Sequence, residues 1–324
     1  MTSRRRRRVL VKRVKHALLV VPECLLVVLG LLLIPPLPHC VIVALSRFAG
    51  RMASLRCFPW TKMIEYNLRY IYGDRRTEAE RRALVREVNT NVVRMVLEVF
   101  WFSWFTGSRT RRYVTLDEDF RAILAAPDGA LLVTAHIGNW ELGALRCAAE
   151  GFPVLSVHAD FGHSVTNSLM QWIRSHTGCR SVPRAGAAVA LLRALHGGDK
   201  IALLLDQYIP VRQGGMFSRI LGRPAIVSGL VGVLSARRKA KVVSVACVHT
   251  GGGRYRFRVY SVLQGDHGMK PEEVTHWIAD SLTRQIEDQP GQWFWMYRRW
   301  RHVPPGENPA DYPPYAVCYK EGRD

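Results

Sequence analysis

The sequence predicts an α/β fold in which a mainly parallel central sheet is flanked by helices. From residue 118 onward, apolar runs alternate with segments of helical periodicity, which is the pattern of strand–helix–strand units. One run, Leu131–Val133, follows the turn-forming Pro127-Asp128-Gly129 and is typical of a buried strand. At 324 residues, the chain is long enough for one large α/β domain and an accessory segment.

The same patterns give the expected elements of this domain. The triple glycine 251–253, between the last two strands, is typical of a hairpin turn. The segment 214–225 is expected to form a loop that lies over the site and leads into a helix. Strands are expected at 130–135, 153–157, 201–205, 242–248 and 255–262, and helices at 140–150, 164–177, 186–197, 225–239 and 271–288.

The N-terminal part divides by charge and hydropathy. Its first 16 residues are strongly basic, and the apolar stretch 17–34 that follows is at the lower length limit for a membrane-spanning helix. Because Pro35-Pro36 interrupts the apolar stretch, three interpretations stay open: a single span, a shallow or re-entrant anchor, and a buried core helix. The predicted segments are a polybasic cytoplasmic tail at 1–16, a membrane anchor at 17–45, a helical membrane-proximal segment at 46–117, the α/β domain at 118–303 and a C-terminal tail at 304–324.

Helical signals are strongest between residues 60 and 113. Thr77-Glu78-Ala79-Glu80 is a capping box, which predicts a helix start. The aromatic run 99–105 is expected either to close a core or to lie at the level of lipid headgroups. One apolar stripe, which predicts core packing, follows the capping box at Leu84, Val88, Val92, Val96 and Val99.

The charge balance points to an anionic partner. Lysine and arginine total 46 against 26 acidic residues, and the net charge of +20 favours a nucleic acid, a membrane surface or a phosphorylated substrate. A hydrophobic content of 48% excludes a disordered basic protein. Seven cysteines without close pairing are typical of reduced packing thiols. We expect neither a metal nor a cofactor, because metal-ligand spacing and glycine-rich nucleotide motifs are absent from the sequence.

His136 directly follows the predicted strand 130–135, at the end where open α/β sheets bind ligands. Gly138-Asn139 is a turn signal, and Asn139 is expected to cap the next helix. Glu141 falls in the first turn of that helix. A carboxylate on one ring nitrogen of His136 would leave the other nitrogen free to accept a proton. The alternative is a core histidine and a glutamate that complements the helix dipole.

Three further polar residues lie at the ends of predicted elements. Arg184 precedes a helix and is expected to contact an anionic substrate or an oxyanion. Asp206 ends an apolar strand and is expected to orient Arg184 or a loop amide, and Arg223 is expected to pair with a phosphate. Surface arginines and a strand-end cap are the alternatives. The aromatic and arginine-rich stretch 292–300 suits a lipid boundary, a nucleic acid strand or a packed cover.

The string from His136 to Glu141 resembles the His-x4-acid motif of glycerolipid acyltransferases, in the form found in the lipid A late acyltransferases. The resemblance runs from about Asn67 to Trp300. Two departures stand out, because Val243-Ser244-Val245 lacks a common proline and Tyr297 stands where a histidine is usual. Further matches follow in order at Arg184, Leu205-Asp206-Gln207, Gly222-Arg223-Pro224-Ala225 and 293–300.

The resemblance implies a glycerolipid acyltransferase-like fold at the inner membrane, with the catalytic domain facing the cytoplasm. It implies transfer of a fatty acyl chain from acyl carrier protein, or from acyl-CoA, to a hydroxyl of a lipid A precursor. No acyl-enzyme is expected, since no serine or cysteine adjoins His136 in the motif. The implied catalytic residues are His136 and Glu141, and the implied substrate-binding residues are Asn139, Arg184, Asp206 and Arg223.

Two alternatives stay open at this stage. The same chemistry could act on another glycolipid, such as a phosphatidylinositol mannoside, with acyl-CoA as donor. A basic, membrane-attached nucleic-acid-binding protein would explain the charge and the stretch 292–300. That second alternative leaves the His136 motif and the α/β pattern unexplained.

Overall fold

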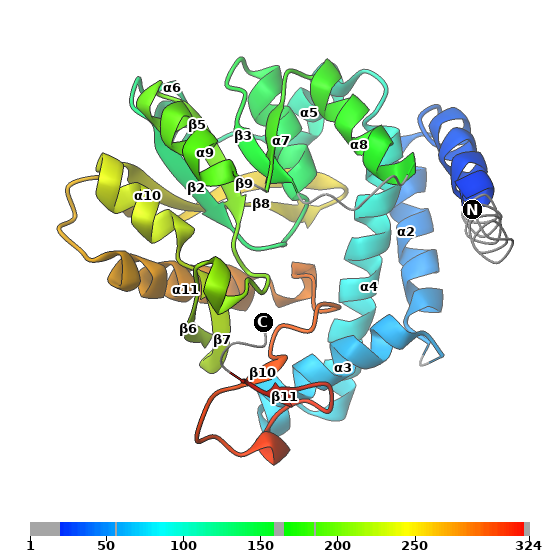
Figure 1. The fold of residues 1–324 in the computed structure, drawn as a ribbon. Coiled ribbons are helices and arrows are strands. Elements are labelled where there is room, and N and C mark those ends of the chain that lie inside the picture. The colour runs from blue at the N-terminus through cyan, green and yellow to red at the C-terminus, as the bar shows by residue number, and fades with distance from the viewer. Residues whose placement is uncertain (1–19, 56, 159–164, 185, 321–324) are drawn as a thin grey trace, which may run out of the picture.

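The computed structural model describes residues 20–55, 57–158, 165–184 and 186–320 (Figure 1). The predicted polybasic tail at 1–16 and its cytoplasmic placement therefore lie outside the described residues.

A central sheet with the strand order β1-β9-β8-β2-β5-β3-β4 organises the described part of the chain. Five of these strands run in one direction, from β8 through β2, β5 and β3 to β4. The antiparallel pairing of β8 with β9 reverses the direction, and β9 then pairs in parallel with β1. The prediction of a mainly parallel sheet is confirmed. The strands are β1 (Val114–Thr115), β2 (Ala130–Thr134), β3 (Leu155–His158), β4 (Arg180–Pro183), β5 (Lys200–Leu204), β8 (Lys241–Gly251) and β9 (Arg254–Leu263).

Helices cover both faces of this sheet (Figure 1). Side chains alternate along β2, so Leu131 and Val133 pack into one apolar core while Leu132 packs into a second core on the other face. The first core lies under α9 (Ala187–His196), α10 (Leu230–Arg238) and α11 (Pro271–Asp288). The second lies under α6 (Glu118–Ala125), α7 (Trp140–Ala149) and α8 (Val165–His176).

The segment 214–225, expected as a loop, contains a β-hairpin instead. Its strands are β6 (Gly215–Ile220) and β7 (Arg223–Ser228), and η2 (Val211–Gln213) precedes them. The turn residues Leu221 and Gly222 both have positive φ angles, 53° and 75°, which suits the tight turn of a hairpin. Because β7 extends to Ser228, the helix predicted at 225–239 begins only at Leu230.

The N-terminal helices lie against one side of the α/β domain (Figure 1). Residues 20–33 are helical, and the helix ends before Pro35-Pro36. Among the described residues, no helix is both long and apolar enough to cross a membrane, so the single-span interpretation has no support there. The following elements are α2 (His39–Ala53), α3 (Pro59–Tyr72), η1 (Gly73–Arg75), α4 (Glu78–Trp101) and α5 (Thr106–Tyr113).

Helices α2 and α4 pack at close range. A Cβ atom on Gly50 would lie 2.5 Å from the Cα atom of Thr90, so only glycine allows this approach. The predicted capping box of α4 is confirmed, with Thr77 and Glu80 bonded reciprocally.

The predicted apolar stripe of α4 holds only for the first half of the helix. Leu84 and Val88 are buried, whereas Val96 is 50% exposed. In the second half the buried face carries Arg94 and Glu98 instead. Charged side chains are rarely buried without partners, so Arg94 and Glu98 are expected to interact with other polar groups.

The aromatic run 99–105 at the end of α4 is partly buried and partly exposed, and its predicted position at the lipid headgroups stays a prediction. Trp101 and Phe102 are buried in the second core, while Trp104 and Phe105 are exposed.

The chain after α11 folds back onto α3 (Figure 1). The Asn67 amide donates to the carbonyls of Trp295 and Tyr297, at 2.7 and 2.9 Å. This clamp fixes the aromatic stretch as a packed cover, in which Trp295 and Trp300 are fully buried. The elements of the chain after α11 are η3 (Pro290–Gln292), β10 (His302–Val303), η4 (Pro309–Asp311) and β11 (Val317–Cys318).

Candidate active site

The end of β2 is held in place by Gln285 of α11. Its Oε1 accepts the backbone N–H of Ala135 at 3.0 Å, and its Nε2 donates to the carbonyl of Val133 and to the hydroxyl of Ser244. Ser244 belongs to the stretch in which the resemblance led us to note a missing proline. Both polar side chains are fully buried, so the exit of the chain toward His136 is rigidly fixed.

Gly138 brings the loop after β2 onto the neighbouring strand β8. Its φ angle is +63°, and a Cβ atom there would lie 2.0 Å from the carbonyl oxygen of Cys247. The next residue, Asn139, donates its N–H to that carbonyl at 3.0 Å. The Asn139 side chain accepts the N–H of Leu142, which confirms the predicted helix cap of α7.

The aromatic stretch supports the same loop from the other side. Gly138 donates its N–H to the carbonyl of Gln292 at 3.1 Å, and Phe294 donates to the carbonyl of His136 at 2.9 Å. Backbone hydrogen bonds therefore hold His136 from two directions.

The His136 ring is bonded through both nitrogens. Nδ1 lies 2.6 Å from Oδ1 of Asp206, and Nε2 lies 3.3 Å from the side-chain amide nitrogen of Gln207. Oδ2 of Asp206 accepts the indole N–H of Trp293 at 2.7 Å. This network fits a neutral ring with its proton on Nδ1 and a lone pair on Nε2. The His136 side chain is 19% exposed and Asp206 only 4%, so solvent reaches the histidine but not its partner.

Asp206 is held as a carboxylate. Burial raises its pKa, but the His136 ring and the hydrogen bonds from His136 and Trp293 outweigh burial, so the pKa lies below the ordinary value. Arg299 lies behind the site, where burial lowers the pKa of its guanidinium to about 10 and the charge of Asp206 opposes that shift. A buried cation near Asp206 adds to the stabilisation of its negative charge.

Glu141 does not contact the His136 ring. Its carboxylate pairs side-on with Arg174 of α8, with 3.1 Å between Nε and Oε2. The prediction that Glu141 orients His136 is therefore wrong in its geometry. The register of the sheet gives the reason, because Thr134 of β2 pairs with Leu204 of β5. His136 and Asp206 each lie two residues beyond this pair and meet at the edge of the sheet.

The structure does not bring the four predicted substrate-binding residues together in one site. Asp206 bonds to the ring and the backbone amide of His136 and to Trp293, so of its two expected partners it has the loop amide and not Arg184. Asn139 is buried, and its amide nitrogen donates to Glu98 at 3.0 Å, which makes it a structural residue of the loop. Arg184 is exposed and donates to Gln213 at 3.2 Å. Arg223 is also exposed, donates to the carbonyl of Tyr70 and stacks on its ring.

Sequence reasoning missed a buried carboxylate beneath the loop. Glu98 of α4 is fully buried and accepts the Asn139 amide and the Tyr255 hydroxyl, the latter at 2.6 Å. His39 at the start of α2 lies 3.2 Å from its other oxygen. The only signal was a glutamate at a helical position within an otherwise apolar stripe.

An apolar pocket of about 90 Å³ lies beside His136, between the sheet and α7. The Trp140 ring at its wall makes an edge contact with the His136 ring, with 4.9 Å between centroids. The Glu141–Arg174 pair also lines it. Three cysteine thiols are among its walls, and burial raises the pKa of each, that of Cys147 to about 12. They are Cys147, Cys179 and Cys247. As protonated thiols they are apolar surface and poor nucleophiles.

A histidine that is hydrogen-bonded to a buried carboxylate, next to an apolar pocket, suits acyl transfer, and the comparison with known families agrees. The family model described as bacterial lipid A biosynthesis acyltransferase matches residues 12–302. The chain belongs to the bacterial lipid A biosynthesis acyltransferase family. A comparison with curated proteins gave no match.

Membership confirms the resemblance seen in the sequence and makes the chain an acyltransferase of lipid A biosynthesis. The choice between an enzyme and a basic nucleic-acid-binding protein is thereby decided in favour of the enzyme. Within the described residues, no group of three or more potential metal ligands comes together.

Proposed function

We propose that this lipid A acyltransferase moves a fatty acyl chain from a thioester of acyl carrier protein to a hydroxyl of a lipid A precursor, with His136 as general base. The observation that carries the proposal is the hydrogen bond of 2.6 Å between His136 Nδ1 and Asp206. It places the ring proton on Nδ1 and leaves Nε2, which lies 3.3 Å from the Gln207 amide, as the nitrogen that can accept a proton.

The reaction follows from this tautomer. Nε2 takes the proton of the acceptor hydroxyl as its oxygen attacks the thioester carbonyl. The carbon–sulfur bond then breaks, the acyl chain stays on the acceptor oxygen, and the leaving thiolate takes the proton from the imidazolium. Asp206 stabilises the charged ring throughout, and the Gln207 amide next to Nε2 is a donor for the reacting oxygen.

The apolar pocket is the proposed site of the acyl chain. It begins at Trp140, whose ring touches His136, and continues among side chains of β2, β5 and β8. Its protonated thiols cannot attack the donor, which supports direct transfer without an acyl-enzyme. The Glu141–Arg174 pair belongs to this pocket in the proposal, and Arg184 and Arg223 are exposed residues for the outer parts of the substrates.

We also propose that the enzyme binds the membrane surface through its N-terminal helices. Exposed apolar side chains are unusually dense there, and Phe48 and Phe105 are exposed by 65% and 71%. Their amphipathic arrangement suits insertion into one leaflet. The exposed residues are Val21, Leu25, Leu26, Val28, Leu29, Leu32 and Leu33 on the first helix, Leu45, Phe48, Met52 and Leu55 on or just after α2, and Trp104 and Phe105 after α4.

The test uses purified protein, an acyl carrier protein thioester or acyl-CoA, and a lipid A precursor, with the products measured by mass spectrometry. We expect His136→Ala to lower kcat by about 10²–10⁴-fold, because the general base is lost while the apolar pocket stays intact. The Arg82→Gln variant, which changes an exposed arginine paired with Glu78, is the control and should keep the wild-type rate. An unchanged rate in His136→Ala would remove this histidine from the mechanism.

A further inference from the structure

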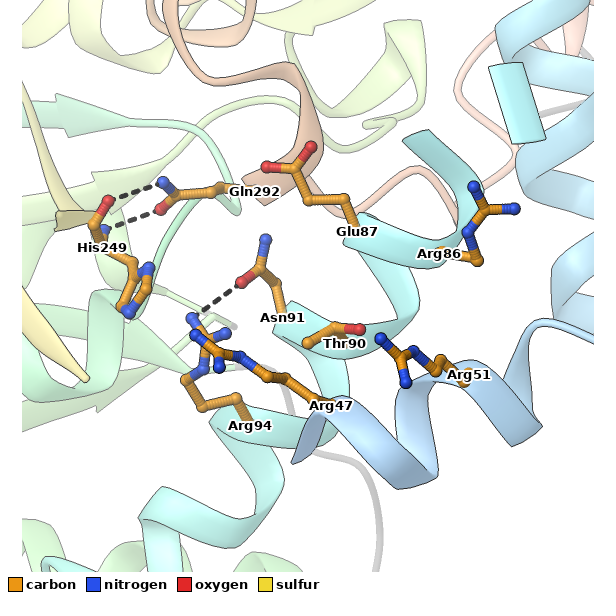
Figure 2. Close-up of a pocket in the computed structure, with 9 residues that line it drawn as sticks. All are labelled: Arg47, Arg51, Arg86, Glu87, Thr90, Asn91, Arg94, His249 and Gln292. Atoms are coloured by element: carbon orange, nitrogen blue, oxygen red, sulfur yellow. Dashed lines mark hydrogen bonds between the residues drawn. The ribbon is translucent and has the colours of Figure 1, made fainter. Parts of the chain in front are cut away.

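A second pocket, of about 360 Å³, lies between α2 and α4 (Figure 2). Each helix contributes two arginines to the lining of this pocket. The two on α2 are one helical turn apart and the two on α4 are two turns apart, so both members of each pair face the pocket. The close contact of Gly50 with Thr90 sets the distance between the helices at this point. We call this second pocket the arginine pocket. Its lining residues are Arg47, Arg51, Arg86, Glu87, Thr90, Asn91, Arg94, His249 and Gln292.

The charge of the arginine pocket is not compensated. Four guanidiniums face one carboxylate, that of Glu87, which leaves an excess of three positive charges. Among the described residues, none of the four arginines forms an ion pair. Figure 2 shows Arg47 and Arg94 extending toward His249. Burial, together with the smaller effect of the charges of Arg94 and Arg47, lowers the pKa of His249 to about 3, so its ring is neutral and adds no charge.

Arg94 is the feature that points to a ligand. Its side chain is 5% exposed, and its only hydrogen bond among the described residues is from one terminal nitrogen to Asn91, at 3.0 Å. Its Nε is buried without a hydrogen-bond partner. A buried guanidinium with unused donors is costly in free energy unless an anion completes its hydrogen bonds. The exposed Arg47, Arg51 and Arg86 form a rim around this buried floor.

We propose that the arginine pocket binds a sugar phosphate of the lipid A precursor, an inference that rests on the proposed function. Forked guanidinium donors match the oxygens of a phosphate or a carboxylate, and the excess of three positive charges favours the phosphate, which carries more charge. The ligand is lipid-borne because the helix that supplies Arg47 and Arg51 also exposes Phe48 and Met52. An anionic head and an apolar body would meet these two kinds of side chain together.

The pocket floor is part of the frame that holds His136. The Gln292 side chain bonds both backbone groups of His249, at 2.7 and 2.9 Å. The carbonyl of Gln292 accepts the N–H of Gly138 in the catalytic loop, and the next residue, Trp293, donates to Asp206. A phosphate anchored here would therefore hold the acceptor against the same loop that carries the base.

The test measures equilibrium binding to the full-length protein in detergent, with a lipid A precursor and the same lipid after removal of its phosphates. We expect Arg47→Gln to weaken binding of the phosphorylated lipid roughly tenfold, the loss of one charged hydrogen bond, and to leave the dephosphorylated lipid unaffected. Arg47→Lys should recover only part of the affinity, since it keeps the charge but loses the planar fork. Arg82→Gln is the matched control, because Arg82 lies on α4 outside the pocket.

Three outcomes would overturn the proposal. The first is equal wild-type affinity for both lipids, and the second is an unchanged phosphate preference in Arg47→Gln and in Arg94→Gln. The third is that Arg47→Gln weakens binding to phosphatidylglycerol vesicles but not to the precursor, which would assign the pocket to bulk lipid. Because binding needs no turnover, His136→Ala should keep the phosphate preference. Failure of the proposed reaction and failure of this site are therefore distinguishable.

Discussion

Two pockets adjoin the loop that carries His136, and they differ in almost every property. The apolar pocket is walled by aliphatic side chains, aromatic rings and protonated thiols, and its one ion pair, Glu141–Arg174, is internally neutral. The arginine pocket carries an excess of three positive charges and a buried, incompletely bonded guanidinium. Binding of an acyl chain is therefore favourable in the apolar pocket, and binding of a phosphate is favourable in the arginine pocket.

The difference suggests how one loop serves two substrates. Gly138 touches β8 next to the apolar pocket through Cys247, and it bonds Gln292 at the floor of the arginine pocket. His136 lies two residues before Gly138 in the same loop. The donor would be recognised by its hydrocarbon chain and the acceptor by its charge, so variants of the two pockets should affect different substrates.

The largest effect on activity should come from Asp206, which bonds His136 in the loop that adjoins both pockets. In Asp206→Asn, the Trp293 indole can only donate, so it will bond the Asn oxygen and turn the amide nitrogen toward His136. An N–H facing Nδ1 favours the tautomer with a proton on Nε2, which cannot act as a base. We expect kcat to fall by about 10²-fold or more, measured by steady-state kinetics, with binding of both substrates retained.

Glu141→Gln is the companion variant that makes this test decisive. It breaks the ion pair with Arg174 at the wall of the apolar pocket, and we expect a loss below about tenfold, mainly as a raised KM for the donor. A loss in kcat equal to that of Asp206→Asn would restore Glu141 as the residue that orients the base.

This pair of acidic residues also shows how far the sequence alone could lead. Apolar runs located β2, β5 and β8, because a strand buried on both faces needs little except hydrophobic side chains. They placed His136 and Asp206 at one edge of the sheet. The spacing of four residues then favoured Glu141 as the partner, although the register of β2 against β5 brings Asp206 to the ring. Register is a tertiary property that a local motif does not contain.

The arginine pocket was beyond sequence reasoning for a related reason. Arg47 and Arg94 belong to helices that meet only in the folded chain, and each arginine on its own has the pattern of a solvated surface residue. The β6–β7 hairpin was missed because its turn, Leu221-Gly222, contains only one residue typical of turns. In the second half of α4, the apolar spacing of Val92 and Val96 predicted burial, but Arg94 and Glu98 occupy the buried face.

An intermediate effect is expected on the exposed apolar surface of α2. Phe48→Glu should weaken binding to phospholipid vesicles about tenfold or more, because an exposed phenyl ring that inserts into lipid is replaced by a charge. Sedimentation with vesicles measures this directly. The control is Val189→Glu, which changes an exposed residue of α9, a helix that lies apart from α2 in Figure 1. Equal losses in both variants would mean that the N-terminal helices do not form the membrane-binding surface.

The smallest effect should separate the two pockets most cleanly. A Cβ atom on Gly143 would lie 3.1 Å from the Cβ of Cys247 and 3.2 Å from the Phe257 ring, so Gly143→Ala adds a methyl group where the apolar pocket is narrow. Each methylene of the donor chain that no longer fits in the pocket should lower kcat/KM about fourfold. The variant enzyme should therefore prefer shorter acyl chains. Competition between donors of different length, read by mass spectrometry, gives this ratio without the absolute rate. Gly197→Ala is the control, because its added methyl would meet only backbone oxygens at 3.5 Å and beyond. The affinity for the phosphorylated acceptor should be the same in both variants. A change in acceptor affinity without a change in chain-length preference would mean that the acyl chain does not occupy this pocket.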